Sequence, residues 1–266
     1  MSRVLIVIPA RFASSRYPGK PLAPLRGASG RARSLIERSF EAARAVRGID
    51  RVLVATDDAR IAEAAAGFGA EVAMTPATCR NGTERCAAVA EKEAGFDIVV
   101  NLQGDAPLTP PWFVEALVAA LRDDAHRAVA TPVLRCDAAA LSGLIEDRRQ
   151  GRVGGTTAVF DRGGRALYFS KEVIPHAGRP LGPAEAIPVF HHVGVYAYRR
   201  APLLAYPALP AGPLEAWEGL EQLRFMENGI PVHCVEVAPR GTAFWELNNP
   251  EDVPILERML LARGTE

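Results

Sequence analysis

The stretch VLIVIPARFASSRYPGKPL, residues 4–22, decides the fold of this chain. Its first part, Val4 to Ile8, is apolar without interruption and stops at Pro9. A run of this length is too short to span a membrane, and it lacks the polar alternation of a half-exposed strand. We therefore expect a strand that is buried on both faces, as the central strand of a parallel sheet is.

The loop after this strand is basic and rich in small residues. Arg11, Arg16 and Lys20 are separated by small residues such as Gly19, and no acidic residue occurs before Glu37. Small residues let a ligand approach the backbone, and cationic side chains on both sides suit a polyanion such as a triphosphate. The loop matches neither the Walker pattern nor GxGxxG. It is therefore either a phosphate-binding loop or a solvated basic turn.

The composition is that of an ordinary soluble protein. The chain has 266 residues, 48% of them hydrophobic, and its 31 Lys and Arg balance 31 Asp and Glu. This balance gives no reason to expect nucleic-acid binding, and no apolar segment is long enough for membrane insertion. The four cysteines form no CxxC pair, which argues against a zinc site or a disulfide framework and favours the cytoplasm. They are Cys79, Cys86, Cys136 and Cys234.

Strand and helix patterns alternate over the first half of the chain. Such alternation with short connections predicts an α/β fold with a mostly parallel, doubly wound sheet. The predicted strands are 51–56, 71–74 and 97–102, and the predicted helices are 34–46, 59–67, 83–94 and 111–122.

The pattern changes after Arg127 to short strands separated by Gly- and Pro-rich turns. We expect a smaller mixed or antiparallel subdomain at about 129–205, inside a single domain that covers 1–266. Its predicted strands are 129–134, 156–160, 166–169 and 192–198, the last with one face exposed. A helix at 214–228, a strand at 232–237 and a helix at 250–263 complete the prediction.

Two strands of the predicted sheet deliver complementary chemistry to one edge. Ligands of parallel sheets bind outside the carboxyl ends of the strands. The first strand brings the basic loop there, and the strand at 97–102 brings Asp105. A phosphate-binding loop facing a carboxylate is what metal-assisted phosphoryl chemistry requires.

Eight motifs occur in an order that resembles the 3-deoxy-manno-octulosonate (Kdo) cytidylyltransferases, or CMP-Kdo synthetases. This resemblance implies a nucleotide-diphospho-sugar transferase fold, usually dimeric. It also implies an enzyme that uses CTP and Mg²⁺ to activate a sugar acid for lipopolysaccharide or capsule. The motifs are IPARFASSRYPGKPL (8–22), VATDD (54–58), RNGTER (80–85), NLQGDAP (101–107), ALYFSKEVIP (166–175), HHVGVYAY (191–198), LEQLR (220–224) and NPEDV (249–253).

The resemblance assigns roles to individual residues. Arg11 and Lys20 would hold the CTP phosphates, and Asp105 would bind Mg²⁺, which prefers carboxylate oxygen. The wider nucleotide site would comprise Pro9, Ala10, Arg11, Lys20, Arg80, Asn81, Gly82, Thr83, Arg85 and Gln103. Without the resemblance, the segment 80–85 is a turn with a helix cap. The sugar acid would be bound by Lys171, His192, Tyr196, Glu221 and Gln222.

The chain departs from the family pattern near the metal and the sugar. Ala106 stands where a Glu usually follows the metal-binding Asp, and Asn248 stands where the family has a second metal-binding Asp. Glu246 could supply the missing charge. Thr157 replaces a lysine, and residues 31–33 form a short insertion. These changes suggest a variant acid such as an amino-ulosonate. The alternatives are an enzyme for sialic acid or another sugar, and a nucleotide-binding relative without catalysis.

Overall fold

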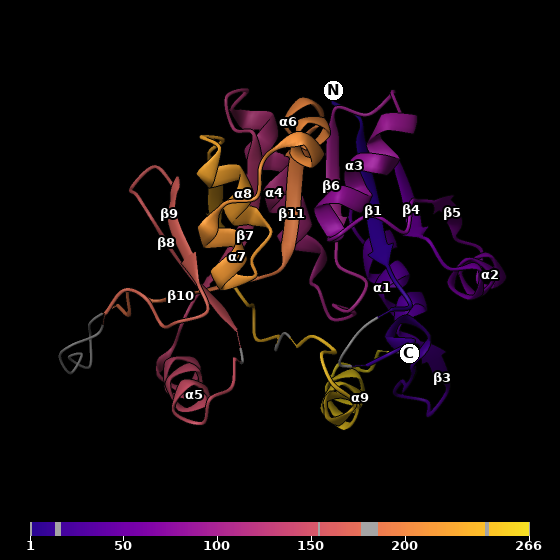
Figure 1. The fold of residues 1–266 in the computed structure, drawn as a ribbon. Coiled ribbons are helices and arrows are strands. Elements are labelled where there is room, and N and C mark those ends of the chain that lie inside the picture. Colours follow the sequence, from indigo (N-terminus) through magenta and orange to yellow (C-terminus); the bar gives the residue numbers. More distant parts are fainter. Residues whose placement is uncertain (1, 14–16, 154, 177–185, 243–244, 266) are drawn as a thin grey trace.

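A computed structural model gives the fold of the chain (Figure 1). It shows an α/β protein built on one large twisted sheet. Arg16 of the predicted phosphate-binding loop lies outside the residues that the structure describes. These are residues 2–13, 17–153, 155–176, 186–242 and 245–265.

The first half of the sheet is parallel, as predicted. Strand β1 (Val4–Ala10) lies between β4 (Arg51–Thr56) and β6 (Ile98–Leu102), and β5 (Glu71–Met74) extends the sheet beyond β4. All seven residues of β1 are buried. The uninterrupted apolar run therefore forms an inner strand with both faces covered.

The second half of the sheet mixes directions. β11 (Val195–Arg199) pairs antiparallel with β6 and β7 (Val129–Arg135), and β12 (Val232–Glu236) pairs parallel with β7. The antiparallel strands β10 (Phe190–His192), β8 (Thr156–Phe160) and β9 (Ala166–Ser170) follow. The mixed pairing agrees with the prediction for this region, and its strands continue the main sheet.

The predicted strand 192–198 was wrong in two respects. It is interrupted at Val193 and Gly194, and the residues from Val193 to Tyr198 other than Gly194 are buried, so no face is exposed. Ala197 is five residues after His192, whereas their partners on β7, Ala130 and Val133, are three residues apart. The two extra residues form a bulge, which the pattern of side chains does not reveal.

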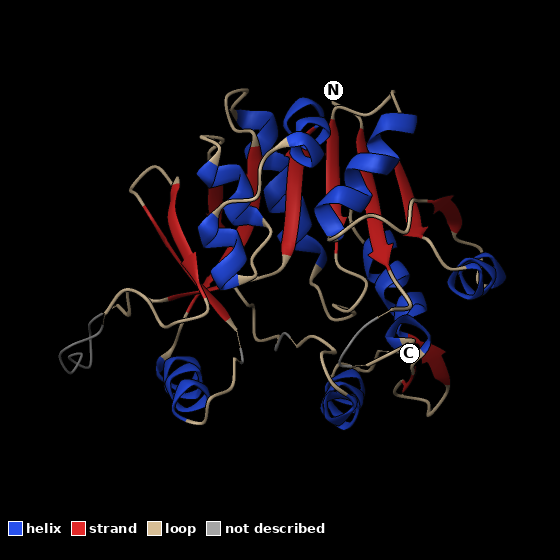
Figure 2. Ribbon diagram, viewed as in Figure 1, coloured by secondary structure: helices blue, strands red, loops and turns tan. Residues whose placement is uncertain are grey.

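Helices cover both faces of the sheet (Figure 2). One face packs against α1 (Leu35–Arg44), α2 (Ala59–Gly67) and α4 (Pro111–Asp123). The other packs against α3 (Gly82–Lys92), α6 (Arg200–Ala205) and α8 (Gln222–Glu227). This two-sided packing confirms the doubly wound arrangement.

The helix predicted at 214–228 is broken in two. α7 (Pro213–Glu218) ends at Gly219, whose φ of 61° is left-handed, and α8 begins three residues later at Gln222. Apolar periodicity continued through the break because Leu220 and Leu223 both face inward, which hid the turn. The turn sets the direction of the Glu221 side chain, which accepts hydrogen bonds from Thr83 and Gln103 in the candidate site.

Several elements were absent from the prediction. Residues 31–33, predicted to be an insertion, lie largely in β3 (Ala32–Ser34), which pairs with β2 (Pro24–Arg26). α5 (Ala138–Arg149) was missed, and the closing segment is a 3₁₀ turn, η3 (Pro250–Asp252), followed by α9 (Val253–Ala262). Two further 3₁₀ turns are η1 (Lys20–Leu22) and η2 (Tyr206–Ala208). In the described part of the chain no helix is long and apolar enough to cross a membrane.

Candidate functional site

Lys20 and Asp105 meet at the carboxyl edge of the sheet, as the sequence predicted. The chain leaves β1 at Ala10 and returns at Gly19, whose N–H donates to the carbonyl of Phe12 (2.9 Å). Lys20 Nζ then lies 2.6 Å from Asp105 Oδ2. The two side chains are 14% and 26% exposed, so the pair is accessible to a ligand.

The loop 103–106 packs tightly against the end of β1. A side-chain carbon on Gly104 would lie 2.8 Å from the carbonyl oxygen of Pro9, a distance that only glycine avoids. Ser39 Oγ donates to the Gly104 carbonyl (3.0 Å). Pro9 and Ala10 therefore border the loop that carries Asp105, and Arg11, the next residue, is exposed to solvent.

The segment before η3 runs alongside Asp105. The Leu247 N–H donates to the Asp105 carbonyl (2.9 Å), so both candidates for the second metal ligand lie next to this loop. A side-chain carbon on Gly194 would lie 3.4 Å from Glu246 Oε1 and 4.0 Å from Gln103 Cγ. The Glu246 carboxylate therefore lies near Gln103. Asn248 N–H donates to Asp252 Oδ2 (2.9 Å).

The chemistry of the donor set fits a Mg²⁺ ion that is shared with a substrate. Within the described ranges no group of three or more His, Cys, Asp or Glu side chains is placed to hold a metal. Mg²⁺ does not need such a group, because it is commonly bound through one or two carboxylates together with substrate phosphates and water. Asp105 can serve as that carboxylate.

The segment 80–85 is the start of α3. Asn81 caps this helix by accepting the Glu84 N–H (2.9 Å), and Arg80 pairs with the Glu84 carboxylate (2.5 Å). Arg85 is buried, where it pairs with Asp57 (3.2 Å) and donates to Thr75 Oγ1. The turn-and-cap interpretation is thus correct for Asn81, and Arg85 ties α3 to the end of β4.

Glu221 joins the start of α3 to the end of β6. Its carboxylate accepts the Thr83 N–H (3.0 Å) and the Gln103 side-chain amide (3.1 Å). Thr83 Oγ1 in turn bonds the hydroxyl of Tyr198 (2.8 Å). A side-chain carbon on Gly82 would lie 3.0 Å from the Gln103 amide nitrogen, so glycine leaves room for this contact.

Two of the remaining predicted sugar residues, Tyr196 and Gln222, lie next to Glu221. Tyr196 donates to Gln222 Oε1 (3.0 Å), and both side chains are buried. His192 is also buried, its ring bonded to Thr131 Oγ1 (2.8 Å). Lys171 lies at the α7–α8 turn, where its N–H donates to Glu218 (2.8 Å).

Burial sets the protonation of this part of the site. It lowers the pKa of His192 to about 3, so the ring is neutral at physiological pH. Burial raises the pKa of Glu221, and the hydrogen bonds from Thr83 and Gln103 counter that rise. The His192 ring is therefore a neutral group held by Thr131, and the Glu221 carboxylate is held by Thr83 and Gln103.

Sequence reasoning missed Asn101 and Arg224 at this site. Asn101 is fully buried, and neither atom of its amide has a hydrogen-bond partner among the described residues; the same holds for Gln222 Nε2. Buried amides of this kind call for a bound ligand or water. The available signal was that Asn101 lies two residues before Gln103, a spacing that points both side chains to one side of an extended chain, and both amides do approach Gly82. Arg224, three residues after Glu221 on α8, was missed too.

Comparison with known proteins gives one consistent family. The cytidylyltransferase family model matches residues 5–236. The 3-deoxy-manno-octulosonate cytidylyltransferase of Maricaulis maris is 45% identical over 262 residues, which cover 98% of each chain. The protein of that name from Anaeromyxobacter is 43% identical over 266 residues, or 99% of each chain. A solved CMP:2-keto-3-deoxy-manno-octonic acid synthetase complexed with CTP superposes with a TM-score of 0.83 at 36% identity, covering 98% of this chain and 100% of that one.

Proposed function

Because the chain belongs to the 3-deoxy-manno-octulosonate cytidylyltransferase family, we propose that it transfers CMP from CTP to the anomeric hydroxyl of Kdo. The hydroxyl oxygen attacks the α-phosphorus of CTP and its proton passes to solvent, the bond from the α-phosphorus to the bridging oxygen of the β-phosphate breaks, and pyrophosphate leaves. The observation that carries the proposal is the pairing of Lys20 with Asp105 at the edge of the sheet, beside the hydrogen-bonded group around Glu221.

The nucleotide half of the site supplies positive charge. The barrier to phosphoryl transfer depends mainly on charge stabilisation and in-line alignment, so no nucleophilic side chain is needed. Lys20 leaves Asp105 when CTP binds and neutralises the phosphates together with Arg11, which is exposed and within reach of a ligand. Residues 80–83, which lead into α3 and include its N-cap Asn81, contact the base.

Mg²⁺ is part of the proposal, and Asp105 would hold it together with the CTP phosphates. When bound, the ion neutralises phosphate charge and polarises the bond that breaks. Asn248, with a neutral amide oxygen, is a weaker ligand than the Asp it replaces, and Glu246 is the nearby carboxylate. Titration of Mg²⁺ by calorimetry, with and without CTP and in Asp105→Asn, tests this assignment without turnover.

The sugar half of the site supplies buried hydrogen-bonding groups. The unpartnered amides of Asn101 and Gln222 and the carboxylate of Glu221 suit the hydroxyl groups of a sugar acid. Lys171, beside the α7–α8 turn, would pair with the sugar carboxylate.

The test is pyrophosphate release from CTP with a panel of acceptors. We expect turnover with Kdo to exceed turnover with sialic acid and with polyol phosphates. A preference for an amino-ulosonate would identify the variant acid that Ala106 and Asn248 suggest. Turnover only with a sugar phosphate would refute the proposal, and CTP binding without turnover on any acceptor would identify a non-catalytic relative.

We also propose a cytoplasmic homodimer that serves lipopolysaccharide or capsule synthesis. Four free thiols support a reducing compartment. Large apolar side chains exposed on α7 and β9 support self-association, and Trp217 is 90% exposed. Light scattering of the full chain tests the oligomeric state.

A further inference from the structure

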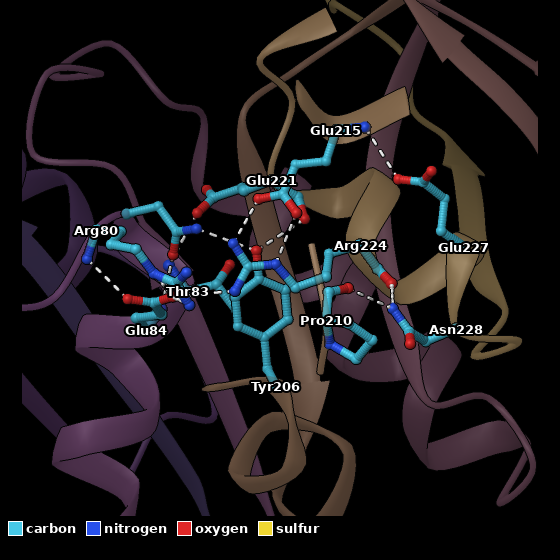
Figure 3. Close-up of polar contacts among 11 residues, drawn as sticks. Arg80, Thr83, Glu84, Tyr206, Pro210, Glu215, Glu221, Arg224, Glu227 and Asn228 are labelled. Carbon is cyan, nitrogen blue, oxygen red and sulfur yellow. Dashed lines mark hydrogen bonds and ion pairs between the residues drawn. The ribbon is translucent and has the colours of Figure 1, made fainter. Parts of the chain in front are cut away.

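Arg224 holds together two segments that carry different halves of the proposed site (Figure 3). Its guanidinium forms a bidentate pair with Glu215 of α7, with Nε–Oε2 and Nη2–Oε1 distances of 2.7 and 2.6 Å. Its third nitrogen, Nη1, lies 3.0 Å from Glu84 Oε1 of α3. The Arg224 side chain is only 3% exposed, so all of these charges interact away from bulk water.

A second chain of contacts runs through Tyr206, over whose ring the Arg224 guanidinium lies at 4.4 Å. The Tyr206 hydroxyl receives a hydrogen bond from the Asn81 amide (3.0 Å) and donates to the Glu221 carbonyl (3.0 Å). Arg224 therefore holds the helix cap of α3 and the α7–α8 turn through a charge pair and through a stacked ring.

The contacts of Glu221 depend on this spacing. Its carboxylate bonds the backbone of Thr83 on α3 and the amide of Gln103 at the end of β6. If α3 moved away from the α7–α8 turn, the bond to Thr83 would lengthen first, because it joins the two segments directly. Without Arg224, Glu84 and Glu215 would also lose the buried cation between them, and only Arg80, whose side chain is 60% exposed, would remain to offset the repulsion between the two carboxylates, which would favour that separation.

We propose that Arg224 is a positioning residue that couples the nucleotide half of the site to the sugar half. The inference rests on the function proposed above. Nucleotide binding at the start of α3 fixes the positions of Glu84 and Asn81. Arg224, which pairs with Glu84, and Tyr206, which bonds Asn81, then hold the α7–α8 turn in place. The Glu221 side chain is thereby oriented to bind the sugar acid. Because coupling is reciprocal, the sugar acid must tighten nucleotide binding by the same factor.

The test uses Arg224→Lys, which keeps the positive charge. A lysine ammonium cannot reproduce the bidentate pair with Glu215 while also binding Glu84. The matched control is Arg199→Lys on β11. Arg199 donates to the carbonyls of Arg127 and Asp124 (3.1 and 3.0 Å), and it pairs in register with Ile98, at the end of β6 opposite the site.

The measurement is the dissociation constant of α,β-methylene-CTP, with and without saturating Kdo. For the wild type and Arg199→Lys we expect Kdo to tighten nucleotide binding about tenfold. In Arg224→Lys the factor should fall to near one. An undiminished factor in Arg224→Lys, or no coupling in the wild type that turns over Kdo, would overturn the inference. If Arg224→Lys does not fold, Glu215→Gln is used with the same expectation.

Hydrogen exchange separates this inference from the proposed function. With the CTP analogue alone, the amides of residues 219–224 should become protected in the wild type and in the control, but not in Arg224→Lys. Equal protection in Arg224→Lys, or none in the wild type, would overturn the inference whichever acid the protein uses. Protection with the expected differences, but no turnover of Kdo, would refute only the proposed acceptor.

Discussion

Replacing Asp105 with asparagine separates its proposed role in catalysis from its role in stability. Asn has nearly the same shape, so the Asp105 carbonyl can still accept the Leu247 N–H, and Lys20 can still donate to the amide oxygen. The substitution removes one negative charge at the place where Mg²⁺ and the CTP phosphates would meet.

The structure predicts a small effect of Asp105→Asn on stability. Because asparagine still accepts the hydrogen bond from Lys20, the substitution exchanges a charge-assisted hydrogen bond for a neutral one, which lowers the free energy of unfolding by about 1 kcal/mol. For a chain of this size that corresponds to a fall of about 2 to 4 °C in Tm. The expected loss in kcat is about 10²- to 10³-fold or more, because the charge acts on the transition state.

The assays are thermal unfolding and pyrophosphate release, run on the same preparations. The control is Glu115→Gln, which removes a carboxylate that is 22% exposed and pairs with Arg47 at 3.0 Å, away from the site. Because Arg47 is 87% exposed, Glu115→Gln should lose no more stability than Asp105→Asn, and it should keep its turnover. If Asp105→Asn retained kcat within about threefold of the wild type, the assignment of Asp105 would be refuted.

Three further substitutions test other parts of the site. Gly82→Ala would bring a side-chain carbon to 3.0 Å from the amides of Asn101 and Gln103, so we expect a raised KM for the sugar acid, through Asn101, and for CTP, through residues 80–83, with little change in Tm; unchanged KM values for both substrates would contradict these proposed contacts. Gly219→Ala forces a left-handed residue to carry a side chain, which should cost about 1 to 2 kcal/mol in chemical denaturation and also raise the KM for the sugar acid. Burial lowers the pKa of His192 to about 3 in the folded protein, whereas in the unfolded chain it is about 6.5. Below about pH 6.5 the unfolded chain therefore binds one proton that the folded protein does not, and the free energy of unfolding falls as the pH falls. The stability advantage of the wild type over His192→Gln should therefore shrink by about 2 kcal/mol between pH 6.5 and 5, and parallel urea-denaturation profiles would count against the buried neutral ring.

The placement of Lys20 and Asp105 could be predicted from sequence. The apolar run at Val4 to Ile8 and the strand ending at Leu102 each identify a buried strand, and neighbouring parallel strands end at the same edge. The resemblance to known cytidylyltransferases added the residues of the sugar half, of which the structure brings Glu221, Gln222 and Tyr196 together. Their roles as ligands stay predictions.

The turn at Gly219 and the bulge at Val193 and Gly194 could not be read from the pattern. In both places the apolar residues keep a periodicity that fits a continuous element, and the break appears only when the segment is packed against its neighbours. Arg224 was hidden for a similar reason. An arginine on a helix usually faces solvent, and nothing local indicates that Glu84, 140 residues earlier in the chain, lies opposite it.

The sequence by itself determined the parallel half of the sheet, the position of the basic loop and the carboxylate that faces it. These features follow from local apolar runs and from the direction in which strands leave a sheet. The tertiary structure alone decided which charges share the buried network around Arg224 and how Glu221 reaches both α3 and β6. A buried charge is stabilised only by partners that burial brings to it, and those partners come from segments far apart in the chain.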